Sequence, residues 1–199
     1  MVLDVTQEDE IRSLTYVIQN IVVKTSLNIK HDFDLKKISE GVTNTDYNPE
    51  RFPGLFLRFK YPKCVIIIFR NGKLILTGLK SFDHIDLVIK RLILTLKDRF
   101  GIYIDNNPIH TKVVNIVITA NFHKQVNLDL AVIKLDNTIY EPEVFPGLIY
   151  HSFNPVKSVF LIFSTGKIVF TGVDDKSIIE PALISLGRLL NDKKLFVGS

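Results

Sequence analysis

The chain has 199 residues, of which 46% are hydrophobic and 23% are charged. This composition argues against a disordered chain, and no apolar run approaches the ~20 residues that a membrane-spanning helix needs, so no membrane partner is expected. The net charge of +4 is uneven: residues 11–100 carry 16 basic and 8 acidic side chains, whereas residues 101–199 carry 9 of each. A basic half suits a polyanion such as nucleic acid, although a well-solvated surface would have the same composition.

The first half opens with a β-branched run, Tyr16–Lys24, which predicts a strand. Asp34 is placed to cap a short helix over Leu35–Glu40, and Gly41 is placed to end it. Extended segments follow, and Asn71-Gly72 between them is a strong hairpin signal.

A long amphipathic helix closes the first half. Ser81 is placed to cap it and Gly101 to end it. Its apolar residues recur at helical spacing and are Ile85, Val88, Ile89, Leu92 and Leu96.

The second half repeats this order. Val113–Ala120 predicts a strand, Asn127 is placed to cap a helix over Leu128–Leu135, and Thr165-Gly166 corresponds to the first hairpin turn. Pro181 should delay or kink the start of the last helix. The apolar residues of that helix are Ile184, Leu186, Leu189 and Leu190.

The two halves also share sequence. From Tyr47/Tyr140 to Pro62/Pro155, eight of sixteen positions are identical, and from Phe69/Phe163 to Gly78/Gly172 five of ten are identical. Two copies of about 90 residues are too few and too long for a solenoid. We therefore expect an acidic segment at 1–14, a first repeat at 15–104 and a second repeat at 105–199 that form one continuous domain.

Antiparallel strands followed by helices predict an α+β layer fold, with helices on one face of the sheet. On the first strand, alternation puts Asn20 and Val22 on one side and Ile21 and Val23 on the other. Both sides of this strand are largely apolar, but helices can cover only one. The second face must be buried elsewhere or bind a partner.

The paired blocks YNPERFPGL/YEPEVFPGL and IIIFRNGK/FLIFSTGK resemble the two hallmark blocks of the TATA-binding protein family, over about residues 15–196. The resemblance implies an internally duplicated saddle: a curved, ten-stranded antiparallel sheet with helices on its convex face and the concave face on the A·T-rich minor groove of double-stranded DNA. This family is a standard example of kinking by inserted apolar side chains. The resemblance thus implies a general factor of transcription initiation, which binds TATA-type promoter elements.

The resemblance also assigns residues. Four phenylalanines match the DNA-intercalating positions, although isolated phenylalanines are usually core residues. Paired asparagines, threonines and branched residues match the groove-contacting positions, where an amide can donate to the acceptors of A·T pairs. The intercalating residues are Phe52, Phe69, Phe145 and Phe163, and the groove residues are Asn20, Asn115, Thr77, Thr171, Val22, Val117, Ile67 and Leu161.

Phosphate contacts carry over less evenly. Basic family positions match Arg51, Arg58, Lys73 and Lys167, with Arg70 as a plausible addition. In the second half, His151 stands where Arg58 stands in the first. Glu40, Asp46 and Glu50 precede the first intercalating residue, where close relatives are basic, and this weakens the expectation of tight DNA binding.

Outer surfaces bind partners in this family. Glu141, Glu143 and Val144 match a loop that a transcription factor IIB-like protein grips. The basic face of Ser81–Arg99 matches a surface used by other general factors, such as IIA-like proteins and TBP-associated factors, although a solvated helix would look the same. Without DNA, the concave face could support self-association.

Neither an enzyme nor a cofactor is expected, because no carboxylate pair sits at helix spacing facing a probable cleft, and neither metal-ligand spacing nor a Gly-rich phosphate loop occurs. The alternative to TATA reading is a paralogue that acts mainly as a protein-interaction scaffold and reads TATA weakly. The basic pI and the absence of an acidic tail weakly favour a nuclear protein, and the single cysteine, Cys64, suits a reducing compartment.

Overall fold

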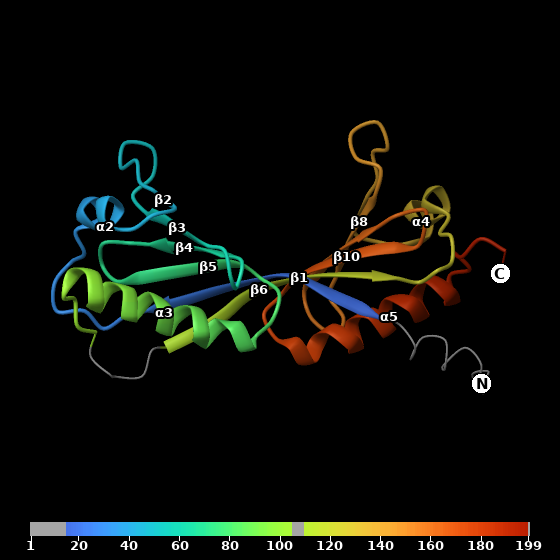
Figure 1. Ribbon diagram of the computed structural model, residues 1–199. Coiled ribbons are helices and arrows are strands. Elements are labelled where there is room, and N and C mark those ends of the chain that lie inside the picture. The colour runs from blue at the N-terminus through green and yellow to red at the C-terminus, as the bar shows by residue number, and fades with distance from the viewer. Residues whose placement is uncertain (1–14, 105–109, 199) are drawn as a thin grey trace. The chain divides into compact units, whose positions relative to one another are not determined.

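The computed structural model describes residues 15–104 and 110–198 (Figure 1). The first part of the chain forms β1 (Tyr16–Ser26), α2 (Leu35–Gly41), β2 (Thr45–Asp46), β3 (Leu55–Phe59), β4 (Cys64–Ile68), β5 (Lys73–Leu79) and α3 (Asp83–Phe100). The second part forms β6 (His110–Asn121), α4 (Leu128–Lys134), β7 (Thr138–Ile139), β8 (Leu148–Ser152), β9 (Ser158–Ile162), β10 (Lys167–Val173), the 3-10 helix η1 (Lys176–Ile178) and α5 (Ile179–Asp192). The predicted segment 1–14 lies outside the described residues.

The strands form a ten-stranded sheet in the order β2-β3-β4-β5-β1-β6-β10-β9-β8-β7. From either edge of the sheet to its middle, the strands of one repeat follow in the same order as their counterparts in the other repeat. This order confirms the predicted α+β fold with an internally duplicated antiparallel sheet. The chain divides into two compact units within β1 and β6. We call Gln19–Asn115 the first unit, and the start of β1 together with Ile116 onward the second unit. The saddle curvature and the repeat boundaries of the sequence stay predictions.

In each unit, one sheet face is buried and the other is half-exposed. On β1, Ile21 and Val23 are fully buried, whereas Asn20 and Val22 on the opposite side are partly exposed. In Figure 1, α3 lies along the strands of the first unit and α5 along those of the second. The helices therefore bury one face in each unit, as the alternation predicted.

The long helices follow the predicted spacing, with two differences at their starts. All five predicted apolar residues of α3 are buried, and Gly101 ends the helix with a left-handed φ of 64°. The residue preceding α3 is Phe82, not Ser81, although the Ser81 hydroxyl still accepts a hydrogen bond from the Asp83 N–H at 3.3 Å. On α5, Leu186 and Leu190 are buried as expected, while Ile184 and Leu189 are half-buried.

The predicted delay of α5 at Pro181 is wrong, because the helix begins at Ile179. Pro181 lies in the first turn, where a backbone N–H has no partner within the helix, so the ring costs no hydrogen bond. The caps Asp34 and Asn127 are confirmed: each side chain accepts from the backbone N–H three residues later. The short helix α4 ends one residue earlier than predicted, at Lys134.

The units differ after their long helices. In the second unit, a left-handed Lys194 turns the chain back, and Leu195 becomes fully buried. The Leu195 carbonyl accepts from the Asn127 N–H at 2.9 Å, and Phe196 forms a bridge with Val126. In the first unit, the same apolar-aromatic-apolar order follows Gly101, but Tyr103 is 75% exposed.

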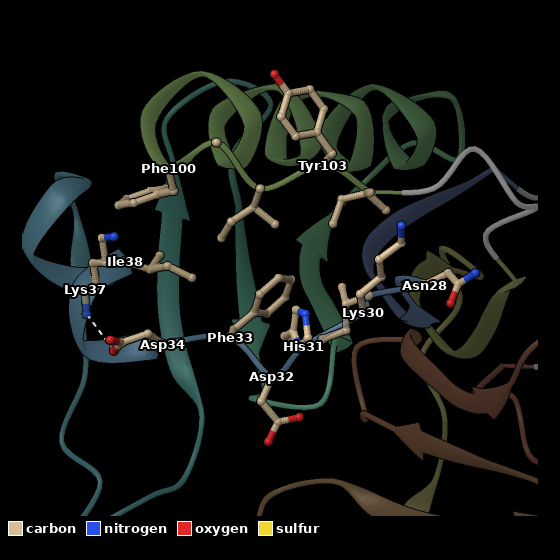
Figure 2. Close-up of a pocket in the computed structure, with 14 residues that line it drawn as sticks. Asn28, Lys30, His31, Asp32, Phe33, Asp34, Lys37, Ile38, Phe100 and Tyr103 are labelled. Atoms are coloured by element: carbon tan, nitrogen blue, oxygen red, sulfur yellow. Dashed lines mark hydrogen bonds between the residues drawn. The ribbon is translucent and has the colours of Figure 1, made fainter.

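A pocket of about 690 Å³ is left between residues 101–104 and the segment before α2. Figure 2 shows Phe33 and Ile38 among the residues that line this pocket, and the largely exposed Tyr103 also lines it. Leu195 and Phe196 thus complete the core of the second unit, whereas Ile102 and Tyr103 leave a pocket in the first unit.

We expect Leu195→Ala to destabilise the protein by about 2–5 kcal/mol, the usual cost of emptying a fully buried leucine site. Ile102→Ala is the matched control and should cost about 1 kcal/mol, because Ile102 is already partly exposed beside an open pocket. Urea denaturation followed by circular dichroism measures both. Equal losses would contradict the difference between the units.

Candidate nucleic-acid interface

The uncovered side of the sheet, which we call the open face, has the same register in both units. On β3, β4 and β5, Phe56 pairs with Ile67, and Ile67 pairs with Ile75. On β8, β9 and β10 the equivalent row is Ile149, Leu161 and Val169. The side chains of both rows are half-buried. The predicted groove residues Ile67 and Leu161 therefore occupy equivalent central positions in two apolar rows.

Two aromatic pairs stand beside these rows. The rings of Phe52 and Phe69 have centroids 5.9 Å apart at 61°, and those of Phe145 and Phe163 are 5.8 Å apart at 66°. Each pair joins a residue of the loop before β3 or β8 to one after β4 or β9. The structure thus brings together the four predicted intercalating residues as two matching edge-to-face pairs, one in each unit.

Local backbone structure fixes each pair. The Phe52 N–H donates to the Asn48 carbonyl at 3.0 Å, and the Phe145 N–H donates to the Glu141 carbonyl at 2.9 Å. Gly54 and Gly147 leave room for the rings: a Cβ would lie 2.6 Å from Phe52 Cε1 at Gly54 and 2.7 Å from Phe145 Cε1 at Gly147. The repeated FPGL motif therefore has a steric reason, because only glycine lets the ring fold back over the sheet.

Asn20 is held in one orientation. Its Oδ1 accepts from the Gly78 N–H at 2.6 Å, and its Nδ2 lies 3.2 Å from the Thr77 hydroxyl. A backbone N–H can only donate, so the amide oxygen must face Gly78 and the amide nitrogen must face Thr77. Asn20 and Thr77, two predicted groove residues, therefore form one polar group with a donor available to a ligand.

A β-bulge creates this arrangement. On β1 and β5, Ile21 pairs with Leu79 and Val23 with Leu76, so β5 carries one extra residue. Gly78 at the bulge has a φ of 89°, and Gly172 has a φ of 91° at the matching bulge of β10. A left-handed glycine is typical of such bulges, which explains the repeated Thr-Gly pair. On β6, Asn115 and Val117 are half-buried and alternate with the buried Ile116 and Ile118.

The predicted basic residues are exposed, but two of them lie near a carboxylate. Arg58 Nη2 lies 4.0 Å from Asp46 Oδ2, and Arg70 Nε lies 3.9 Å from Asp32 Oδ2. Arg51, Lys73 and Lys167 are also exposed. His151 pairs with Val159 just as Arg58 pairs with Val65, so the substitution falls at the same point of the register.

Three further basic side chains of the first unit were missed by the sequence reasoning. Lys24, His110 and Lys112 line a hollow of the open face together with Phe69 and Lys73. Period-two alternation from Asn20 and Val22 puts Lys24 on the same side of β1, so the signal for Lys24 was present in the sequence.

The surfaces predicted to bind proteins are partly engaged within the chain. Glu141, Glu143 and Val144 are exposed, Val144 by 80%. On α3, the Arg91 guanidinium donates to the Tyr61 carbonyl at 2.6 Å, and Arg99 donates to the Gly41 carbonyl at 2.8 Å. Those two arginines tie α3 to its own unit, and the exposed Lys90 and Lys97 remain as candidates for a partner surface.

Within residues 15–104 and 110–198, no cluster of His, Cys, Asp or Glu is arranged to hold a metal ion. The pocket of Figure 2 contains Asp32, Asp34 and His31, but the Asp34 carboxylate accepts from the Lys37 N–H as a helix cap. Among the described helices, none has the length and apolarity to span a membrane.

Comparison with known proteins adds a family. Residues 15–99 and 110–193 match the family model described as "Transcription factor TFIID (or TATA-binding protein, TBP)". The chain is 43% identical over 166 residues to the TATA-box-binding protein of Sulfurisphaera tokodaii, covering 83% of this chain and 81% of that protein. It is 40% identical over 178 residues to the one of Pyrobaculum islandicum, covering 89% and 87%.

A solved structure, that of Methanococcus jannaschii TBP, matches with a TM-score of 0.77 and 40% identity, covering 90% of this chain and 98% of that one. The relatives named here come from archaea, whose cells have no nucleus. These relatives therefore give no support to the nuclear localisation that the sequence suggested.

We expect Phe145→Ala to lower the free energy of unfolding by less than about 1.5 kcal/mol, because its side chain is only half-buried. Phe160→Ala in the same unit is the control: Phe160 is fully buried and stacks on Phe170 at 4.4 Å, so about 3–5 kcal/mol should be lost. Guanidinium denaturation measures both variants. A loss as large as that of Phe160→Ala would make Phe145 a core residue.

Proposed function

The chain belongs to the TATA-binding protein family of DNA-binding transcription factors, and from this premise we propose that it kinks TATA-type DNA by inserting phenylalanines into the minor groove. In this role, each unit lays its open face on one half of the site. The bent complex then nucleates assembly of the transcription initiation machinery.

The observation that carries the proposal is the repeated aromatic pair. Phe52 with Phe69, and Phe145 with Phe163, present the same edge-to-face geometry in separate units. An apolar ring inserted between two base pairs replaces one face of a stacked base and recovers part of the lost stacking energy. Two such pairs would insert at two base steps, one for each unit.

The half-buried rows beside the pairs suit the floor of a widened groove. Branched side chains such as Ile67 and Leu161 exclude water from sugar and base edges. The Asn20 amide donor, fixed by Gly78, suits the N3 and O2 acceptors of A·T pairs, whereas a G·C pair would put its N2 amine in the way. Asn115 takes the corresponding role on β6.

We also assign the exposed Glu141, Glu143 and Val144 to a IIB-like factor. Lys90 and Lys97 on α3 suit IIA-like or TBP-associated factors, and the apolar open face suits self-association when DNA is absent. A protein scaffold that reads TATA weakly is the second candidate. The acidic partners of Arg58 and Arg70 favour it, because they compete with phosphates.

A TATA duplex and a G·C-substituted duplex, labelled with a fluorophore at each end, test the function. The parent should bind the TATA duplex more tightly and raise energy transfer between the ends, because the kink brings them closer. Phe52→Ala and Phe145→Ala should each reduce affinity and energy transfer, since each removes an inserted ring. Equal binding to both duplexes without a bend would favour the scaffold, and full bending by both variants would refute insertion.

The salt dependence of DNA binding should change with the charge at the register position that Arg58 and His151 share. Arg58→Ala should flatten the slope of log affinity against log salt by about one unit, because one phosphate contact is lost. His151→Arg should steepen it by a similar amount, because the charge is added at the equivalent position. Lys36→Ala, on the exposed side of α2, is the control and should leave the slope unchanged. Filter binding from low to moderate salt measures all three, and an unchanged slope in both test variants would place these residues away from phosphate.

A further inference from the structure

The open face carries a hollow in each unit, and the two hollows have the same construction. The hollow of the first unit, about 540 Å³, includes Phe69, Lys73 and Ile75, and that of the second, about 650 Å³, includes Phe163, Lys167 and Val169. These three residue pairs are equivalent in the repeat. A ligand that repeats along its length, such as a DNA groove, would meet the same shape twice.

The charge of the hollows differs. Lys24 pairs with Ile75 on β5, whereas Thr119 pairs with Val169 on β10, so Lys24 and Thr119 are equivalent positions. Counting back from Asn20 and Asn115, Lys112 corresponds to Val17. Among the residues that the structure describes, three lysines line the first hollow and one lines the second, and no acidic side chain lines either.

The lysines concentrate positive charge at the first hollow, and this charge favours an anionic ligand. Lys24 is exposed and stands in the same row as Ile67 and Ile75, between the aromatic pair and Asn20. A lysine in that row would face the groove floor, where A·T pairs offer only acceptors. The G·C amine would oppose the same ammonium group.

We propose that Lys24, supported by Lys112, directs the first unit to the more A·T-rich half of the site and so sets the orientation of the protein on DNA. This inference rests on the proposed function. The duplicated geometry by itself lets the protein bind in two orientations related by the repeat. Because only the first unit has a lysine at this position, the two orientations differ in energy.

The orientation can be measured with a duplex whose site is all A·T in one half and carries one G·C pair in the other. Val144→Cys, in the exposed loop beside Phe145, is linked to iron-EDTA, which cleaves nearby DNA. Burial raises the pKa of the Cys64 thiol to about 11, with a smaller opposing effect of Arg91, so the natural cysteine should stay unlabelled. Cleavage then reports which end of the site the second unit occupies.

The labelled protein should cleave mainly at the G·C-containing half. Lys24→Thr should lower the ratio of cleavage at the two ends by about tenfold to a hundredfold, the scale of one charged hydrogen bond. Lys24→Thr combined with Thr119→Lys should reverse the preferred end. Lys36→Thr removes the same charge from the exposed side of α2 and should leave the ratio unchanged.

A ratio unaltered by Lys24→Thr, in a protein that still binds and bends the duplex, would overturn the role of Lys24 and leave the proposed function intact. An unbiased ratio in the labelled protein would also overturn it. Failure of the parent to prefer or bend TATA DNA would instead refute the proposed function, and with it this inference. Because Lys24 is exposed, Lys24→Thr does not threaten the fold.

Discussion

The structure depends on a sheet that is apolar on both faces but covered by helices on only one. Burying Ile21, Val23 and their neighbours against α3 stabilises the first unit, and the same arrangement with α5 stabilises the second. The opposite face keeps branched and aromatic side chains that only shield one another. Such a face would favour aggregation or self-pairing unless a ligand uses it. The function that we propose is therefore linked to the layer arrangement.

Glycines determine where the aromatic rings and the Asn20 amide of the open face lie. At Gly78 and Gly172 a left-handed backbone allows a bulge, and the bulge of the first unit gives Asn20 a backbone N–H to accept from. At Gly54 and Gly147 the absence of a Cβ lets an aromatic ring fold back beside its partner. These positions join backbone geometry to surface chemistry. Substitution there would move the rings or the amide without removing any side chain of the proposed contact surface.

Much of this could be predicted from the sequence because the signals are local. Alternation identified the two sheet faces, and caps at Asp34 and Asn127 fixed the short helices. The repeat and the family resemblance supplied the residues of the candidate site. The structure brings the four phenylalanines among them together as two aromatic pairs. The start of α5 was mispredicted because a proline in the first turn costs no hydrogen bond, and the sequence alone does not fix which turn contains it.

Other features could not be predicted because they depend on distant segments. The internal contacts of Arg91 and Arg99 cross from α3 to a hairpin and to the end of α2, so their charges looked free for partners. The pocket after α3 could not be expected, because Ile102 and the buried Leu195 stand in the same apolar-aromatic-apolar order but differ in burial. Local patterns fix elements, whereas side-chain availability depends on tertiary contacts.

The two units thus preserve geometry while they diverge in charge. Ring separations agree within 0.1 Å between the units, from 5.9 Å to 5.8 Å. Yet His151 occupies the position of Arg58 in the second repeat, and Thr119 occupies that of Lys24. Shape must be kept in both copies because packing against a regular ligand tolerates little displacement. Charge on exposed positions is less constrained, because an exposed side chain can change without disturbing the core. A duplicated fold can therefore acquire a direction through surface electrostatics alone, without altering the backbone that either copy presents.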